Sequence, residues 1–296
     1  MNTSSPFGSL VTAMVSPFAP DGSLDLNRAR ELARHLVENA STGLVVAGTT
    51  GESPTLSHDE KLQLFKAVKE AVDVPVIANV GSNNTRASVE LAREAAELGV
   101  AALLAVVPYY NKPSQEGLFQ HFKAIAEATP LPLVLYNLPG RTSRNMEAAT
   151  TARLSEIPNI IATKESSGDP TQWARTKMLA KDDFLLISGN DSDTLPMLAL
   201  GAIGVVSVIS HIAGKQMKQI MDAFWSGDLQ TALDIHCRLL PVVDALFPPS
   251  SSNPIPLKAA LKLQKFDCGG LRLPLVNANE AETEAVRVAM TNAELL

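Results

Sequence analysis

The sequence predicts a (β/α)8 TIM barrel with a small C-terminal helical region, from two patterns that alternate along 296 residues. Short apolar runs rich in Val, Ile and Leu recur at steps of about 20 to 30 residues, which is typical of buried parallel strands. Amphipathic segments lie between them. Eight strands, each followed by a helix, remove every sheet edge by closing into a barrel. The expected strands are residues 10–15, 43–49, 74–80, 101–107, 131–137, 160–165, 184–189 and 204–210.

The amphipathic segments predict the intervening helices. Several of them open with residues that cap helices, and one is closed by Gly99. No Gly-x-Gly-x-x-Gly fingerprint follows the first strand, so an open dinucleotide-binding sheet fits the sequence less well than a barrel. Examples of the expected helices are residues 25–40, 59–72, 85–98 and 115–128.

After Gly227 the alternation stops and only helical patterns remain, so we expect a catalytic barrel over residues 1–227 and a helical region over residues 228–296. A Pro- and Ser-rich break at residues 248–256 interrupts this region. We interpret the region as a cover for the barrel or as an oligomer contact. A separate binding or regulatory module is the alternative.

Composition excludes several classes of function. The net charge is −6, the pI is about 5.4, and Lys and Arg are scattered, so we expect no nucleic-acid partner. No apolar run reaches the length of a membrane span, and the first residues lack the pattern of a signal peptide, so we expect a cytoplasmic protein. Cys237 and Cys268 form no Cys-x-x-Cys motif, and we expect two reduced thiols.

Metal and hydrolase chemistry also find little support. The histidines have no zinc-site spacing, and no Gly-x-Ser-x-Gly elbow occurs, so we expect no metal and no serine nucleophile. The loop after the seventh strand carries Asp191 and Asp193, which would repel a phosphate group.

Polar residues gather where the expected strands end, which is where barrel enzymes place their chemistry. Lys164 follows an apolar strand, so desolvation favours a neutral amine that can attack a ketone. A lysine that pairs with Glu165 or reaches solvent explains that position equally well. Tyr136, on the neighbouring strand, can exchange protons, and Thr49 and Tyr110 could complete a hydroxyl relay. Each tyrosine taken singly is also explained by packing, with its phenol in water.

Two further features suit carboxylate groups. The backbone N–H groups of residues 49–51 can form a concave donor cluster for a small carboxylate. Arg141, just beyond the fifth strand, can bind a second carboxylate through two parallel hydrogen bonds. A solvated loop arginine is the alternative for Arg141.

Five motifs follow one another along almost the whole chain: GTTGES at 48–53, PYYNKP at 108–113, LYNLPGRT at 135–142, TKE at 163–165 and NPIP at 253–256. In this order they resemble the dihydrodipicolinate synthase and N-acetylneuraminate lyase superfamily, and within it the synthase branch. The resemblance implies condensation of pyruvate with L-aspartate 4-semialdehyde in lysine and diaminopimelate biosynthesis. It also implies that no cofactor is required and that the protein forms a homotetramer, a dimer of dimers.

The resemblance also implies the roles of individual residues. Lys164 would form the Schiff base with pyruvate, whose carboxylate Thr50 and its loop would hold. Tyr136 would be the general acid and base, linked through Thr49 to Tyr110, which enters from a neighbouring subunit in the family.

Substrate-binding positions are implied in the same way. Arg141 would bind the carboxylate of aspartate 4-semialdehyde, and Gly189 and Val206 would line the pyruvate pocket.

Two other functions share parts of this pattern. Another class I pyruvate-dependent aldolase, cleaving a sugar-derived 2-keto acid, would share the lysine and tyrosine chemistry. Thr49, Thr50 and Arg141 argue against it, because the sialate-cleaving branch usually has Ser-Thr in that loop and lacks this arginine. A non-catalytic barrel would be expected to lose Lys164 or Tyr136, and both are present.

A separate lysine-binding site occurs at the dimer interface of lysine-inhibited relatives. In this chain Lys61 stands where a histidine is common, and Ala87 stands where a glutamate meets the ligand's ammonium group. We therefore expect weak or absent inhibition by L-lysine. The chain keeps four residues at matching positions, namely Ser53, His58, Asn83 and Tyr109.

Overall fold

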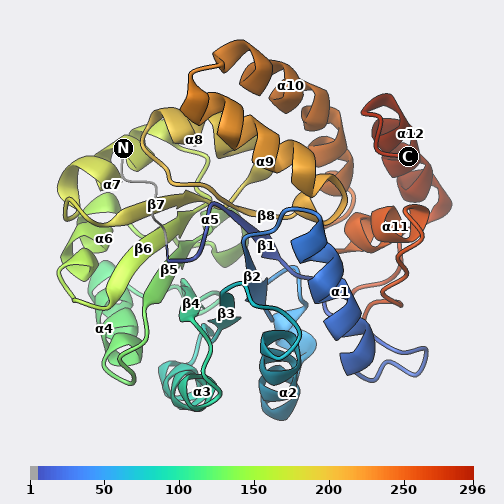
Figure 1. Cartoon of the computed structure of the whole chain (residues 1–296). Coiled ribbons are helices and arrows are strands. Elements are labelled where there is room, and N and C mark those ends of the chain that lie inside the picture. Colours follow the sequence, from blue (N-terminus) through green and yellow to red (C-terminus); the bar gives the residue numbers. More distant parts are fainter. Residues whose placement is uncertain (1–5) are drawn as a thin grey trace.

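Eight parallel strands form a closed barrel in the order in which they occur along the chain, which confirms the predicted fold (Figure 1). The structure is a computed structural model and describes residues 6–296. The barrel closes where β1 pairs with both β2 and β8. The strands are β1 (Leu10–Ala13), β2 (Gly43–Val46), β3 (Val76–Asn79), β4 (Ala102–Val106), β5 (Leu133–Asn137), β6 (Ile160–Glu165), β7 (Leu185–Ser188) and β8 (Val205–Ser207).

Helices surround the barrel (Figure 1). Several begin at the capping residues that the sequence offers: the Ser57 hydroxyl accepts from the Glu60 N–H, and the Glu60 carboxylate accepts from the Ser57 N–H. The helices of the barrel are α1 (Leu26–Glu38), α2 (His58–Lys69), α3 (Thr85–Glu97), α4 (Gln115–Ala126), α5 (Pro139–Thr142), α6 (Ala148–Ser155), α7 (Pro170–Leu179), α8 (Thr194–Ala199) and α9 (Ser210–Ser226). Short 3-10 turns are η1 (Ser53–Thr55) and η2 (Asp191–Asp193).

Both faces of the sheet are buried, which explains why the strands are apolar almost throughout. Side chains such as Val45, Leu104 and Val206 meet inside the barrel. Their neighbours, such as Leu44 and Leu103, pack outward against the helices. Alternation along a strand therefore decides which polar residues at the strand ends face the barrel axis.

Three helices make up the C-terminal region: α10 (Leu229–Leu246), α11 (Ile255–Leu263) and α12 (Glu280–Asn292). Helix α10 lies against α9, and α11 lies beside α12 (Figure 1). Helix α11 begins at Ile255, within the break expected at residues 248–256. A buried ion pair of 2.9 Å joins Lys258 of α11 to Glu52, in the loop after β2. The C-terminal region therefore supports a loop at the barrel mouth.

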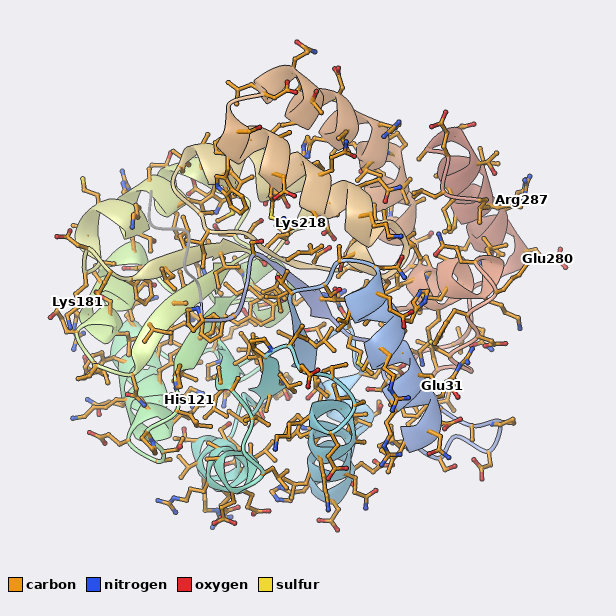
Figure 2. All side chains as sticks on the ribbon, viewed as in Figure 1. Glu31, His121, Lys181, Lys218, Glu280 and Arg287 are labelled. Carbon is orange, nitrogen blue, oxygen red and sulfur yellow. The ribbon has the colours of Figure 1, made fainter. Side chains whose placement is uncertain are left out.

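Charged side chains lie mostly on the periphery. Figure 2 shows Lys181, in the loop after α7, and Glu280 and Arg287, on α12, at the edge of the molecule. Cys237 is exposed, Cys268 is buried, and both are free thiols. Among residues 6–296, no helix is both long and apolar enough to cross a membrane.

Candidate active site

A small cavity of about 50 Å³ opens at the carboxyl ends of the strands. Its walls come from β1, β2 and β4 to β6, from the loops after β2, β5, β7 and β8, and from the C-terminal region. Most of the predicted site residues therefore meet in one place. The lining residues are Ala13, Val45, Gly48, Thr49, Thr50, Leu104, Tyr136, Leu138, Arg141, Lys164, Gly189, Asn190, Val208, Phe247 and Asn253.

Lys164 and Tyr136 are directly opposite each other on β6 and β5. Each side chain is about 5% exposed, and Lys164 Nζ lies 4.0 Å from the centroid of the Tyr136 ring. Glu165 follows Lys164 on the strand and therefore faces the other side of the sheet. Among the described residues, no ion pair joins Lys164 to Glu165. The geometry thus favours a cavity-facing amine over a paired or solvated lysine.

Gly189 leaves room for the lysine side chain. A Cβ atom at this position would overlap the Ser166 hydroxyl and would lie 3.0 Å from Cγ and Cε of Lys164. Val206 lies in the barrel interior, and Val208 of the same segment lines the cavity. A residue larger than glycine at position 189 would therefore displace the Ser166 hydroxyl and crowd the Lys164 side chain.

The loop after β2 presents donors to the cavity. The Ser16 hydroxyl donates to the Gly51 carbonyl at 2.6 Å, and Glu52 adopts a left-handed backbone conformation with φ of 55°. Within residues 6–296, no acceptor faces the N–H groups of Thr50 and Gly51. Both donors are available to a small anion.

Asn253 connects the two regions that sequence analysis assigned to carboxylates. Its Nδ2 donates to Thr50 Oγ1 at 2.8 Å, and its carbonyl accepts from Arg141 Nη2 at 3.2 Å. Its Oδ1 is buried and has no partner among the described residues. The role of Asn253 could not be predicted from the sequence, because this residue lies 203 residues from Thr50 and no spacing rule links them.

Asp191 is a second polar residue whose position was not foreseen. The carboxylate accepts from the Ser207 hydroxyl at 2.5 Å and from the N–H groups of Val208 and Ile209 at 3.0 Å each. Burial raises the pKa of Asp191, while these hydrogen bonds and the charge of Lys164 lower it in part. Asp191 therefore ties the β7 loop to the β8 loop close to the lysine.

Tyr110 is not part of the cavity of its own chain. Its side chain is 88% exposed, and its backbone is left-handed, with φ of 72°. A second cavity of about 190 Å³ adjoins the first and shares Thr49, Leu138 and Arg141 with it. A hydroxyl relay through Tyr110 is therefore not assembled within one chain.

Two of the four residues of the expected lysine site line this second cavity, and the other two lie at the start of α2 and in the loop before α3. Ser53 and Tyr109 line the cavity. His58 Nε2 lies 3.0 Å from Glu94 Oε2, and the carbonyl of Asn83 accepts a hydrogen bond from a neighbouring loop. Lys61 is half-buried, and burial lowers its pKa. Weak or absent inhibition by L-lysine stays a prediction.

Known proteins resemble the chain over its whole length. The model of the dihydrodipicolinate synthetase family matches residues 6–293. The 4-hydroxy-tetrahydrodipicolinate synthase of Moorella thermoacetica is 54% identical over 292 residues, which cover 98% of this chain and 99% of the relative. The enzyme of that name from Desulforamulus reducens is 53% identical over 293 residues, 98% of each chain.

A solved structure agrees equally well. DHDPS from Cyanidioschyzon merolae with lysine bound superposes with a TM-score of 0.96 at 46% identity, covering 99% of this chain and 100% of the other. The fold, the cavity residues and these matches lead to one conclusion: the chain belongs to the dihydrodipicolinate synthetase family.

Proposed function

We propose that the chain is a Schiff-base-forming lyase that condenses pyruvate with L-aspartate 4-semialdehyde to give 4-hydroxy-tetrahydrodipicolinate, with Lys164 as the nucleophile. The observation that carries the assignment is the buried amine of Lys164, 4.0 Å from the Tyr136 ring centroid in a cavity that Thr50 and Arg141 also line. Relatives about half identical to this chain are named for the same reaction.

In the first half of the proposed reaction, the neutral amine of Lys164 attacks the ketone carbon of pyruvate. Water leaves, and an imine forms. The N–H groups of Thr50 and Gly51 hold the pyruvate carboxylate. Tyr136 transfers the protons, first to the departing hydroxyl and then from the methyl group, which produces the nucleophilic enamine.

In the second half, the enamine carbon attacks the aldehyde carbon of the semialdehyde, whose carboxylate Arg141 binds. A proton from Tyr136 neutralises the new alkoxide. The amine of the second substrate then attacks the imine carbon and displaces Lys164, which closes the ring and regenerates the enzyme. One water is released overall, and no redox partner or cofactor is needed.

The test is a product assay that compares aspartate 4-semialdehyde with candidate keto-sugar acids. We expect turnover only when pyruvate and aspartate 4-semialdehyde are present together. Cleavage of a keto-sugar acid, with no product from the semialdehyde, would instead assign the chain to the aldolase alternative.

The proposal includes an oligomer, in which Tyr110 of a neighbouring subunit enters the second cavity and reaches Thr49. A fully exposed tyrosine on a left-handed backbone supports this, because such a conformation is costly without a compensating contact. We propose a homotetramer in the cytoplasm, built as a dimer of dimers.

Subunit complementation tests this sharing. Lys164→Ala and Tyr110→Phe subunits should each be nearly inactive alone, since one lacks the nucleophile and the other lacks the relay hydroxyl. Mixed dimers contain one site with both groups intact, so co-expression should restore activity. If the mixture stays as inactive as its parents, or if a monomer sediments as the fully active species, Tyr110 does not act across an interface.

A further inference from the structure

A buried polar network lies behind the catalytic pair, on the outer face of the barrel. Tyr136 and Lys164 oppose each other across β5 and β6, and so do the next residues, Asn137 and Glu165. Alternation turns the first pair towards the cavity and the second pair away from it. Asn137 and Glu165 are both completely buried. Any shift between them is therefore transmitted directly to the catalytic pair.

Within the described part of the chain, Glu165 has no cationic partner. Among residues 6–296, none of its contacts is an ion pair, and burial raises its pKa. The partners of its carboxylate are all N–H donors. Asn137 Nδ2 donates to both oxygens at 3.1 and 3.2 Å, the Ser167 N–H at 2.8 Å, and Gln172 Nε2 at 3.3 Å. Burying an unpaired carboxylate is costly, so its hydrogen bonds must serve the structure around it.

The network continues into the loop that carries Arg141. Asn137 Nδ2 also donates to Asn145 Oδ1 at 2.8 Å, and Asn137 Oδ1 accepts from the Met146 N–H at 3.0 Å. The Asn137 side chain therefore joins the two ends of the segment 137–146, which contains α5. The Met146 N–H also fixes the orientation of the Asn137 amide, so its NH₂ group must face Glu165.

Gln172 completes the arrangement from α7. Its Oε1 accepts from Asn145 Nδ2 at 2.6 Å, and its Nε2 donates to Asn145 Oδ1 at 3.1 Å. The donor and the acceptor of each of these hydrogen bonds are therefore defined. They are satisfied only if both Glu165 oxygens accept hydrogen bonds.

We propose that Glu165 is a positioning residue, which acts through Asn137 to hold Lys164 against Tyr136 and to hold the Arg141 loop over the cavity. The inference rests on the proposed function, because it assigns a purpose to the placement of those three residues. Glu165 touches neither substrate in this scheme. Its effect should fall on the steps that use Lys164, Tyr136 and Arg141, and not on the loop after β2 that holds the pyruvate carboxylate.

The first variant is Glu165→Gln, which keeps the shape but presents an NH₂ group to N–H donors. Misplacing the reacting groups by about 1 Å costs about a hundredfold in rate. We expect kcat to fall by about tenfold to a hundredfold and the KM for aspartate 4-semialdehyde to rise severalfold. The KM for pyruvate should change little, because the loop after β2 lies outside the network. The matched control is Glu147→Gln, an exposed carboxylate at the N-terminus of α6 with no side-chain cap bond.

A second variant moves the carboxylate from position 165 on β6 to position 137 on β5. In Glu165→Gln with Asn137→Asp, the carboxylate at position 137 accepts from the Met146 N–H and from the new NH₂ group. The amides of Asn145 and Gln172 can turn over together to match these contacts, and the Met146 carbonyl then loses the two side-chain donors that it has in the unmodified protein. We expect this double variant to recover at least tenfold of the lost kcat. If Glu165 only stabilised the fold, the variants would yield less folded protein. The folded fraction would then keep the kcat and both KM values of the unmodified enzyme.

The outcomes separate this inference from the proposed function. Unmodified protein must be trapped by borohydride and pyruvate at Lys164, and failure there would refute the function itself. If trapping succeeds but Glu165→Gln matches the Glu147→Gln control, the positioning role is refuted. If Glu165→Gln does not fold, the double variant decides: activity within about tenfold of the unmodified enzyme supports the role, and a folded, inactive double variant overturns it.

Discussion

The inner and outer halves of the active site are built in different ways. In the inner half, Lys164 and Tyr136 stand on adjacent strands, nearly buried, and the ladder between β5 and β6 sets their separation. In the outer half, Arg141 stands on the short helix α5 and Tyr110 on the loop after β4, and both side chains are exposed. Arg141 donates one hydrogen bond to the carbonyl of Asn253. One chain can therefore place the nucleophile and Tyr136 by itself. Binding of the second substrate depends on the C-terminal region, and completion of the proton relay depends, in our proposal, on a neighbouring subunit.

The largest expected effect comes from the inner half. Lys164→Arg should lower turnover by about four orders of magnitude or more, because an always-protonated guanidinium cannot form the imine. The measurement is the steady-state rate with both substrates saturating. Lys66→Arg, an exposed lysine on α2, is the matched control and should retain full activity. Substantial turnover by the Lys164 variant would show that Lys164 is not the nucleophile, and the inner half would then not carry the covalent chemistry.

Arg141 tests the outer half, with a smaller and more selective effect. Arg141→Ala removes charge-assisted hydrogen bonds of about 1.5 to 3 kcal/mol, so kcat/KM for aspartate 4-semialdehyde should fall by roughly tenfold to about 150-fold. Arg141→Lys should recover only part of the loss, since an ammonium cannot bind a carboxylate in parallel. The KM for pyruvate should stay unchanged in both variants. An equal rise in both KM values would mean that the two halves are not independent.

Regulation should show the smallest effect, because it depends on the periphery of the second cavity. His58 is already paired with Glu94, and Ala87 offers no carboxylate to an ammonium group. We expect L-lysine to bind roughly tenfold to a hundredfold more weakly than to a site with that carboxylate. Inhibition curves with and without Ala87→Glu measure this, and the substitution should begin to restore inhibition. Half-inhibition of the unmodified enzyme at sub-millimolar lysine would contradict the prediction.

The same division explains how much could be predicted from the sequence. Strand periodicity was sufficient for the barrel and for the proximity of Lys164 and Tyr136, because neighbouring parallel strands end at the same level. Contacts between distant segments were not accessible in this way. Asn253 meets Arg141 across 112 residues, and no local pattern specifies where a loop after α10 will lie.

The burial of polar residues could not be predicted from the sequence either. Asp191 and Glu165 follow strands in ordinary loop or strand-end contexts, and nothing local distinguishes a solvated carboxylate from a completely buried one. The choice between Val206 and Val208 as the cavity-lining residue likewise depends on where β8 stops, which varies by one or two residues in any assignment.

The central claim is that Lys164 is the covalent nucleophile, and chemical trapping of the unmodified enzyme tests it most directly. Borohydride added with pyruvate should reduce the imine to a stable secondary amine, and peptide mapping by mass spectrometry should place one reduced pyruvyl group on Lys164. No label should appear when pyruvate is omitted. Labelling of a different lysine, or none at all in the presence of pyruvate, would contradict the account.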